Sequence, residues 1–332
     1  MDAAIFFSHA LAMILYKKTK ADPLTESLSL PWSRYNHSPS PDTTTIQNVV
    51  TLIWSVVDHH GLSHLISSPE LFERFLLNLA KTYKNNEYHN LTHALHVTIS
   101  VSHLISMTSF NLSPMDKLVL IIAAIAHDAE HPGNNNEYQR ENDTELYKAN
   151  PVSTLESNSA EIVKKLSKDY LFLYRSDQSS SSKTENDDNL NLRRTFGSHV
   201  HTLILSTDIS MGDVAGTRLK SALKTPPPHD KVDVMAYLLR MADIACVFQP
   251  SYGVYCQWAR NLMIESAVKE LGEFVMRQKG FLKGYVRGEL MIGYQSGIFE
   301  DKVLLNCLDD NIERLERKTV EEAIDDLLRS EI

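Results

Sequence analysis

Two short segments of this 332-residue chain combine histidine with acidic or amide side chains at spacings that suit metal chemistry. The first, YHNLTHA, places His89 and His93 four residues apart, so on a helix both imidazoles project from one face. The second, HDAEH, begins with His127 and Asp128 directly after the apolar run LVLIIAAIA. So many polar groups at the end of a buried helix are costly unless a metal ion or a hydrogen-bond network satisfies them.

Asp243 is a third candidate, because it lies within the apolar helical sequence LLRMADIA. A buried carboxylate needs a cation or a strong donor, and either a metal ion or the nearby Arg240 meets that need. If Asp243 meets the second segment in space, two imidazoles and two carboxylates are available to one ion. The candidate ligands are His93, His127, Asp128 and Asp243. This set suits Zn²⁺, Mn²⁺ or Fe²⁺, and a bridging carboxylate such as Asp128 can reach a second, mostly water-ligated ion such as Mg²⁺.

The chemistry that these residues predict is hydrolysis of a phosphate ester. Two metal ions about 3.5–4 Å apart lower the pKa of a shared water and clamp the phosphoryl oxygens during in-line attack. The leaving alkoxide then needs a proton, which His89, beside the metal ligands without being required as one, is suited to donate. A single histidine pair at this spacing is commonly a surface coincidence. This chain also has the adjacent His127 and Asp128, and Asp243 within an apolar sequence. Three candidate sites in one chain favour a metal site over coincidence.

Composition limits the kinds of partner. The net charge of -9 argues against a broad nucleic-acid surface, which needs clustered Lys and Arg. It does not exclude a small anionic substrate, because bound metal ions can invert the local field. The three cysteines, Cys246, Cys256 and Cys307, are too few and too scattered for a disulfide framework or a thiolate zinc site. We therefore expect a reducing, intracellular setting in the cytoplasm.

Apolar residues recur mostly at helical spacing, which predicts an all-α fold. A Ser- and Pro-rich linker indicates that residues 1–44 are an N-terminal helix with a linker, followed by a catalytic domain over residues 45–328. The polar segment 178–191 cannot bury apolar surface and is expected to be a mobile loop. The apolar residues 3–16 are too few to span a bilayer. We expect a packing or interaction helix there, with contact to a membrane surface as the alternative.

The motifs resemble those of one family. YHNLTHA resembles the YHNxxHAxDV element of the class I cyclic nucleotide phosphodiesterases, HDAEHPGNNN resembles their HDxxHPGxxN element, and MADIA resembles their ADxS segment. The resemblance covers about residues 45–328. It implies a compact, all-α bundle of about sixteen helices of the HD type, with a deep pocket. It also implies a role in signal transduction. It also implies hydrolysis of cAMP, cGMP or both to the 5′-monophosphate by a metal-bridging hydroxide, and allows a homodimer.

The resemblance also implies residue roles. His89 would be the general acid that protonates the ribose 3′ oxygen. The first metal, Zn²⁺ or else Mn²⁺ or Fe²⁺, would be held by His93, His127, Asp128 and Asp243. The second, Mg²⁺ or Mn²⁺, with its water shell would be surrounded by His131, Asn136, Glu156, Thr207 and Asp208. The substrate would contact Tyr88, Gln295, Ile298 and Phe299, with Gln295 on the purine edge.

Several positions depart from the family pattern. An aspartate is replaced by His96, a second aspartate by Glu130, two histidines by Asn158 and Ser159, an asparagine near the base by Cys246, and a phenylalanine three residues after the purine glutamine by Ile298. None of these changes removes a metal ligand, so they bear on base selectivity and rate. Two other functions stay open: a broader His-Asp phosphohydrolase, and a non-catalytic protein that binds a cyclic nucleotide.

Overall fold

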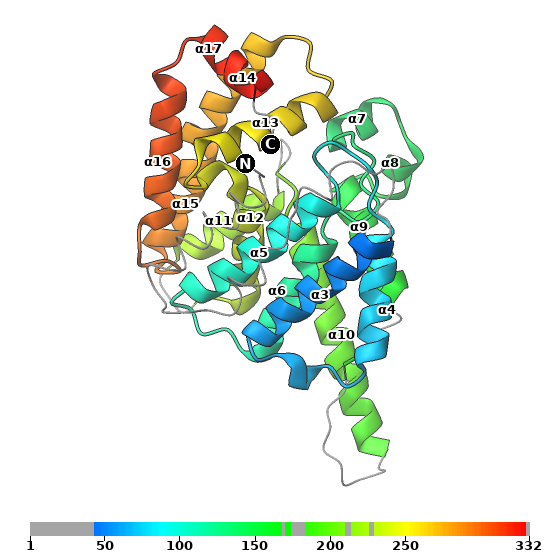
Figure 1. The fold of residues 1–332 in the computed structure, drawn as a ribbon. Helices are drawn as coiled ribbons and strands as arrows, with labels where there is room; N and C mark the ends of the chain where they lie inside the picture. The colour runs from blue at the N-terminus through cyan, green and yellow to red at the C-terminus, as the bar shows by residue number, and fades with distance from the viewer. Residues whose placement is uncertain (1–42, 168–169, 174–182, 210–213, 226–228, 330–332) are drawn as a thin grey trace.

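The structure, a computed structural model, describes residues 43–167, 170–173, 183–209, 214–225 and 229–329 (Figure 1). The predicted N-terminal helix and linker therefore lie outside the described residues, apart from their last two positions. The expected homodimer and the membrane contact of residues 3–16 stay predictions. Within the described ranges, no helix combines the length and the apolar character needed to cross a membrane.

The described chain is built from helices, which confirms the all-α prediction. In chain order the α-helices are α3 (Thr43–His59), α4 (Pro69–Ala80), α5 (Leu91–Met107), α6 (Pro114–Ala126), α7 (Asn136–Glu141), α8 (Glu145–Ala149), α9 (Thr154–Ser167), α10 (Lys183–Leu205), α11 (Val214–Lys224), α12 (Lys231–Asp243), α13 (Tyr252–Glu265), α14 (Leu271–Gly280), α15 (Arg287–Gln295), α16 (Val303–Glu316) and α17 (Val320–Arg329). Short 3-10 turns η2 (Ser63–Leu65) and η3 (Ala245–Phe248) and a π-helical segment η4 (Phe281–Val286) complete it.

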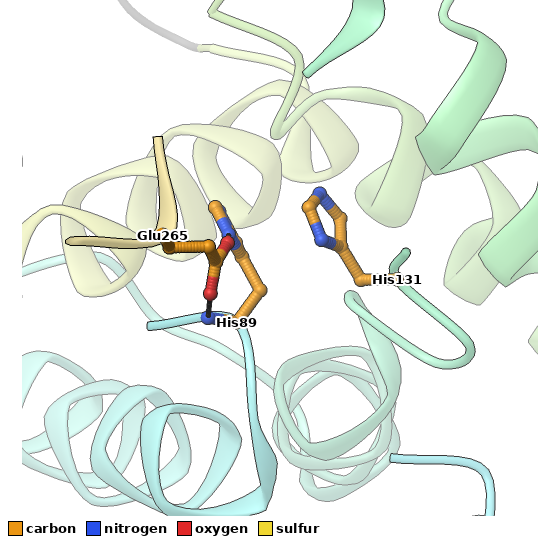
Figure 2. A group of neighbouring side chains, drawn as sticks. All are labelled: His89, His131 and Glu265. Carbon is orange, nitrogen blue, oxygen red and sulfur yellow. Dashed lines mark hydrogen bonds and ion pairs between the residues drawn. The ribbon is translucent and has the colours of Figure 1, made fainter. Parts of the chain in front are cut away.

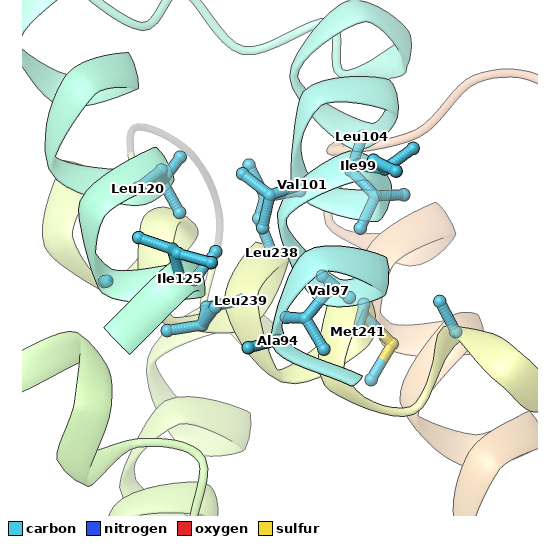
Figure 3. Packing of buried hydrophobic residues seen from close by; sticks show 14 of the residues in the cluster. Ala94, Val97, Ile99, Val101, Leu104, Leu120, Ile125, Leu238, Leu239 and Met241 are labelled. Atoms are coloured by element: carbon cyan, nitrogen blue, oxygen red, sulfur yellow. The ribbon is translucent and has the colours of Figure 1, made fainter. Parts of the chain in front are cut away.

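Three helices form the centre of the bundle. The apolar run from Leu118 to Ala126 lies in α6 and is buried on every side, as expected of a helix that is hydrophobic all round. Helices α5 and α12 pack against α6, with Val97, Leu120 and Leu238 among the side chains that meet there (Figure 3). Helix α10 also lies against α6. The central helices are thus fixed by apolar burial.

The ends of these three helices are set by local sequence signals. Helix α6 begins with a capping box, in which the side chains of Ser113 and Asp116 satisfy backbone N–H groups, and it ends directly before His127. Helix α5 begins at the N-cap Asn90, whose side chain accepts from the backbone N–H of His93. Helix α12 ends at Asp243. The start of α5 and the ends of α6 and α12 therefore carry the candidate ligands.

The predicted loop over residues 178–191 is wrong in its second half. Residues 178–182 lie outside the described ranges, but residues 183–191 form the first turns of α10. Adding one residue to an existing helix is much easier than nucleating one, so the helix anchored on α6 extends into a polar sequence. Polar composition alone did not reveal this extension.

Truncating Leu238 tests whether the central packing stabilises the fold. The side chain is 0% exposed, so Leu238→Ala leaves a cavity and is expected to lower the free energy of unfolding in urea by about 2–5 kcal/mol. The matched control is Leu328→Ala on α17, where the side chain is 48% exposed and the loss is expected to be within about 0.5 kcal/mol. Equal losses for both variants would contradict this packing.

Candidate active site

The converging helix ends open onto one cavity of about 880 Å³. Most of the residues predicted to act at the site line it: Tyr88, His89, Asp128, His131, Asn136, Glu156, Thr207, Asp208 and Asp243. His93 and His127 are each 1% exposed and lie behind this lining. The structure therefore brings together segments that are separated by as many as 155 positions (243 minus 88).

The four predicted metal ligands form one cluster. His93 Nε2 lies 3.0 Å from Asp243 Oδ1 and 3.5 Å from Asp128 Oδ2. His127 Nε2 lies 3.1 Å from Asp128 Oδ2 and 3.3 Å from Asp243 Oδ1. Ligand atoms about 2.1 Å from a common ion are about 3.0–3.4 Å from one another. The ligand atoms of His93, His127 and Asp243 lie close enough together to hold one divalent cation, and Asp128 lies against both imidazoles.

Hydrogen bonding and charge prepare this cluster for a cation. His127 Nδ1 lies 2.9 Å from the carbonyl oxygen of Ala124; with Nδ1 as the donor, Nε2 is the ring atom that faces the carboxylates and can bind a cation once it releases its proton. Burial lowers the pKa of His127, but the carboxylates of Asp128 and Asp243 outweigh burial and raise the pKa well above its usual value. Conversely, burial raises the pKa of Asp243, but His127 and His93 hold it below its usual range. Two partly buried carboxylates kept ionised beside two buried imidazoles are a suitable donor set for Zn²⁺ or Mn²⁺.

A second group of polar residues lines the same cavity as Asp128. Asn136 Nδ2 donates to Glu156 Oε2 over 2.9 Å, and Asn136 Oδ1 accepts from the backbone N–H of Leu155. Asp208 accepts from the Ser153 hydroxyl over 2.7 Å. Burial, with the charge of Asp208, raises the pKa of Glu156 to about 7. Carboxylates that repel one another in this way favour a second cation between them.

His89 is held by a residue that the sequence did not single out, Glu265 at the end of α13. Its carboxylate accepts from the backbone N–H groups of Tyr88 and His89, over 2.7 and 3.0 Å, and pairs with His89 Nδ1 (Figure 2). Burial lowers the pKa of His89, but Asp128 and Glu265 outweigh burial and raise it. Glu265 therefore favours a charged His89 and leaves Nε2 as the remaining ring donor.

His131 completes this group in a neutral form. Its ring stacks on that of His89 with 3.9 Å between centroids and 25° between planes. Burial and the charge on His89 lower the pKa of His131 to about 4. The lone pairs of two stacked rings lie in nearly parallel planes and do not point at one common ion. In addition, His131 Nδ1 already accepts from the backbone N–H of Gly133. Although His89, His131 and Glu265 are close enough to consider a metal ion, this geometry suits a proton donor better.

The predicted base-binding residues do not lie at the cavity, which corrects the sequence analysis. Gln295 is exposed at the end of α15, while Ile298 and Phe299 are buried in the hydrophobic core, outside the cavity lining. Phe299 instead packs near the rings of Tyr237 and Tyr294. The family resemblance implied this assignment, but resemblance along the chain does not determine position in space.

Gln278 and Phe281 line the cavity in their place. They are three residues apart at the junction of α14 and η4, a spacing that puts both on one side of a helix. The sequence carries the signal as QKGF, a glutamine followed by a phenylalanine three residues later. Gln278 lies 35 positions after Asp243 (278 minus 243). Only residues 266–270 separate α13 from α14.

The divergent positions lie mainly around the ligands. Cys246 lines the cavity, with Sγ 3.8 Å from the Tyr88 hydroxyl. His96 is buried, and its ring centroid lies 5.2 Å from that of Trp258. Ser159 donates to the carbonyl oxygen of Ala129 over 3.0 Å and so ties α9 to the turn after α6. His96 and Ser159 therefore make contacts inside the fold, whereas Cys246 changes a residue of the cavity lining.

Comparison with known proteins gives a consistent set of relatives. Residues 88–273, more than half of the chain, match the sequence profile described as 3′5′-cyclic nucleotide phosphodiesterase. The 3′,5′-cyclic-nucleotide phosphodiesterase regA of Dictyostelium discoideum is 28% identical over 273 residues, covering 71% of this chain and 33% of the relative. The high affinity cGMP-specific 3′,5′-cyclic phosphodiesterase 9A of Mus musculus is 39% identical over 98 residues, covering 29% of this chain and 18% of the relative.

Another relative is the dual specificity calcium/calmodulin-dependent 3′,5′-cyclic nucleotide phosphodiesterase 1B of Bos taurus, 28% identical over 224 residues, which cover 65% of this chain and 39% of the relative. The chain thus spans well under half the length of these curated relatives. Among solved structures, the phosphodiesterase domain of the RhoPDE fusion protein from Salpingoeca rosetta has a TM-score of 0.70 at 16% identity, covering 95% of this chain and 98% of that one. This likeness shows that the fold is shared.

Removing the charge of Glu265 tests its effect on His89. Glu265→Gln is expected to lower the pKa of His89, because the paired anion that favours the imidazolium is lost. An NMR titration of the histidine rings in the metal-free protein measures this shift. Glu87→Gln, at an exposed neighbouring position, is the matched control and is expected to leave the pKa unchanged. An equal pKa of His89 in all three proteins would show that Glu265 does not set it.

Proposed function

Because the chain belongs to the 3′,5′-cyclic nucleotide phosphodiesterase family, we propose that it hydrolyses cAMP, cGMP or both to the nucleoside 5′-monophosphate. The observation that carries this proposal is the position of His89 on the same cavity as Asp128 and Asp243, whose carboxylates meet His93 and His127. A proton donor and a cation-binding cluster on one cavity are the two parts that cleavage of a phosphodiester requires.

Two groups of residues would hold the cations. The first cation would be held by His93, His127, Asp128 and Asp243. The second would lie near Asp128, with His131, Asn136, Glu156, Thr207 and Asp208 around it and its water shell. When bound, such a pair of divalent ions neutralises phosphate charge and lowers the pKa of water. We propose Zn²⁺, Mn²⁺ or Fe²⁺ for the first position and Mg²⁺ or Mn²⁺ for the second.

His89 would supply the proton that the reaction needs. Water adds to phosphorus, the bond from phosphorus to the ribose 3′ oxygen breaks, and that oxygen takes a proton. Glu265 occupies His89 Nδ1, so Nε2 carries the proton that is transferred. Since Asp128 and Glu265 raise the pKa of His89, the ring stays protonated to a higher pH than an ordinary histidine. The neutral His131 stacked on it does not compete as an acid.

The base would lie at the other end of the cavity, against Gln278 and Phe281. An aromatic ring can cover the face of a purine, and an amide can donate and accept at its edge. Because an amide can turn over, Gln278 suits adenine and guanine alike. Cys246 offers only a weak thiol donor on this wall. These contacts support a purine nucleotide and leave cAMP and cGMP as joint candidates.

Turnover of the purified protein tests the proposal. We expect Mg²⁺- or Mn²⁺-dependent formation of AMP from cAMP, GMP from cGMP, or both, measured by chromatography of the products. His127→Ala removes a metal ligand without touching the cavity lining and is expected to lower kcat at least about a hundredfold. A metal-replete protein as inactive as His127→Ala would contradict the proposal. Nucleotide binding without turnover would favour the non-catalytic sensor, and turnover of other phosphoesters alone would favour the broader phosphohydrolase.

A pair of glutamine variants tests the corrected base site. Gln278→Ala is expected to raise KM for the cyclic nucleotide about tenfold, because the purine edge loses its hydrogen-bond partner. Gln295→Ala makes the same change at an exposed position and is expected to leave KM within about twofold of the wild type. Steady-state kinetics with each nucleotide measures both. A larger effect at Gln295 than at Gln278 would reverse the assignment.

A further inference from the structure

Arg240 is a buried cation close to the cavity that the proposed reaction does not use. It lies on α12 three residues before Asp243, and its side chain is 1% exposed. A guanidinium presents its donors in a rigid, planar fork, so one Arg can hold several acceptors in fixed relative positions. The contacts of Arg240 therefore show which parts of the chain it joins.

One side of the guanidinium holds the segment that follows α10. Arg240 Nη1 donates to the carbonyl oxygen of Ser206 over 2.5 Å and to that of Asp208 over 2.7 Å. These two carbonyls flank Thr207, and both Thr207 and Asp208 line the cavity. The side chain of Asp208 is bound separately, by the hydroxyl of Ser153. Arg240 thus fixes the backbone of the segment proposed to face the second cation.

The other side of the guanidinium holds the wall proposed to carry the base. Arg240 Nη2 donates to the Tyr285 hydroxyl over 2.5 Å. The Tyr285 ring stacks on that of Phe281, with 5.3 Å between centroids and 12° between planes, and Phe281 lines the cavity. Both aromatic residues belong to the π-helical segment η4, a geometry that is rare and often found at functional sites.

Tyr285 also contacts a lysine. The ammonium of Lys220 lies 5.0 Å from the centre of the Tyr285 ring and pairs over 2.6 Å with the buried carboxylate of Glu289. A cation over an aromatic face is an attractive contact. The ring is thus placed by Phe281, Lys220 and Arg240 together, and its hydroxyl lies where the guanidinium needs an acceptor.

We propose that Arg240 and Tyr285 are positioning residues that fix the Phe281 wall relative to the Thr207–Asp208 segment. The tie sets the distance between the base end and the cation end of the cavity. It rests on the proposed function for the identity of those two ends. A change at Tyr285 then alters the position of the Thr207–Asp208 segment, although Tyr285 is not among the residues that line the cavity.

Tyr285→Phe tests the tie with a minimal change. It deletes the acceptor of Arg240 and keeps the ring that stacks on Phe281. Tyr294→Phe on α15 is the matched control, because it deletes a hydroxyl from a tyrosine in the same part of the chain, outside the cavity lining. In metal-free protein, hydrogen exchange of a peptide containing residues 206–208 is expected to be at least about threefold faster in Tyr285→Phe than in Tyr294→Phe.

Loss of the tie is expected to change the Mg²⁺ concentration that turnover needs and to leave kcat at saturating Mg²⁺ nearly unchanged. In Tyr285→Phe, the Mg²⁺ concentration for half-maximal turnover is expected to rise about three- to tenfold, with kcat at saturating Mg²⁺ within about twofold of the wild type. Equal exchange in the two variants overturns the tie. Faster exchange with an unchanged Mg²⁺ requirement overturns its positioning role. If the wild type has no turnover, the proposed function fails; Mn²⁺ binding by calorimetry then replaces turnover, and equal affinity in the two variants overturns the positioning role.

Discussion

The structure depends on the placement of the partly buried Asp128 and Asp243 against the buried His93 and His127. Two ionised carboxylates in such a site repel each other and lose part of their hydration, a cost that is offset only if cations or donors satisfy them. The imidazoles lie 3.0–3.5 Å from the carboxylates and offset part of this cost. Divalent cations would offset the rest. The constraint explains why the polar cluster is confined to helix ends, where backbone and side chains can be directed at one point.

The helices meet this constraint through apolar packing elsewhere. The part of α6 from Leu118 to Ala126 is buried on all sides, so it brings His127 to the cluster without a solvent-exposed face of its own. Helix α5 presents His93 in its first turn, and α12 presents Asp243 at its last residue. The buried guanidinium of Arg240 then joins α12 to both ends of the cavity. Packing in the core and positioning in the site are therefore properties of the same three helices.

The sequence predicted the parts of the site that are local and missed those that depend on packing. The candidate ligands follow from short motifs at the ends of apolar helices, and the structure places them together. Glu265 ends α13 and Gln278 lies on α14. Nothing in the immediate sequence of Glu265 shows that it pairs with His89, and the QKGF pattern does not by itself show that Gln278 reaches the cavity. Gln295 was implied by the family resemblance, yet it is exposed at the end of α15. The first turns of α10 were missed because polar composition does not report the packing that extends a helix.

Anomalous diffraction from crystals soaked in Mn²⁺ tests the central claim most directly, because it locates cations without reference to activity. We predict one strong peak enclosed by His93, His127, Asp128 and Asp243, and a second on the side of Asp128 that faces Glu156 and Asp208. A peak among His89, His131 and Glu265 in place of these would show that the proposed proton donor is a metal ligand. The absence of any peak at the four-residue cluster would contradict the account.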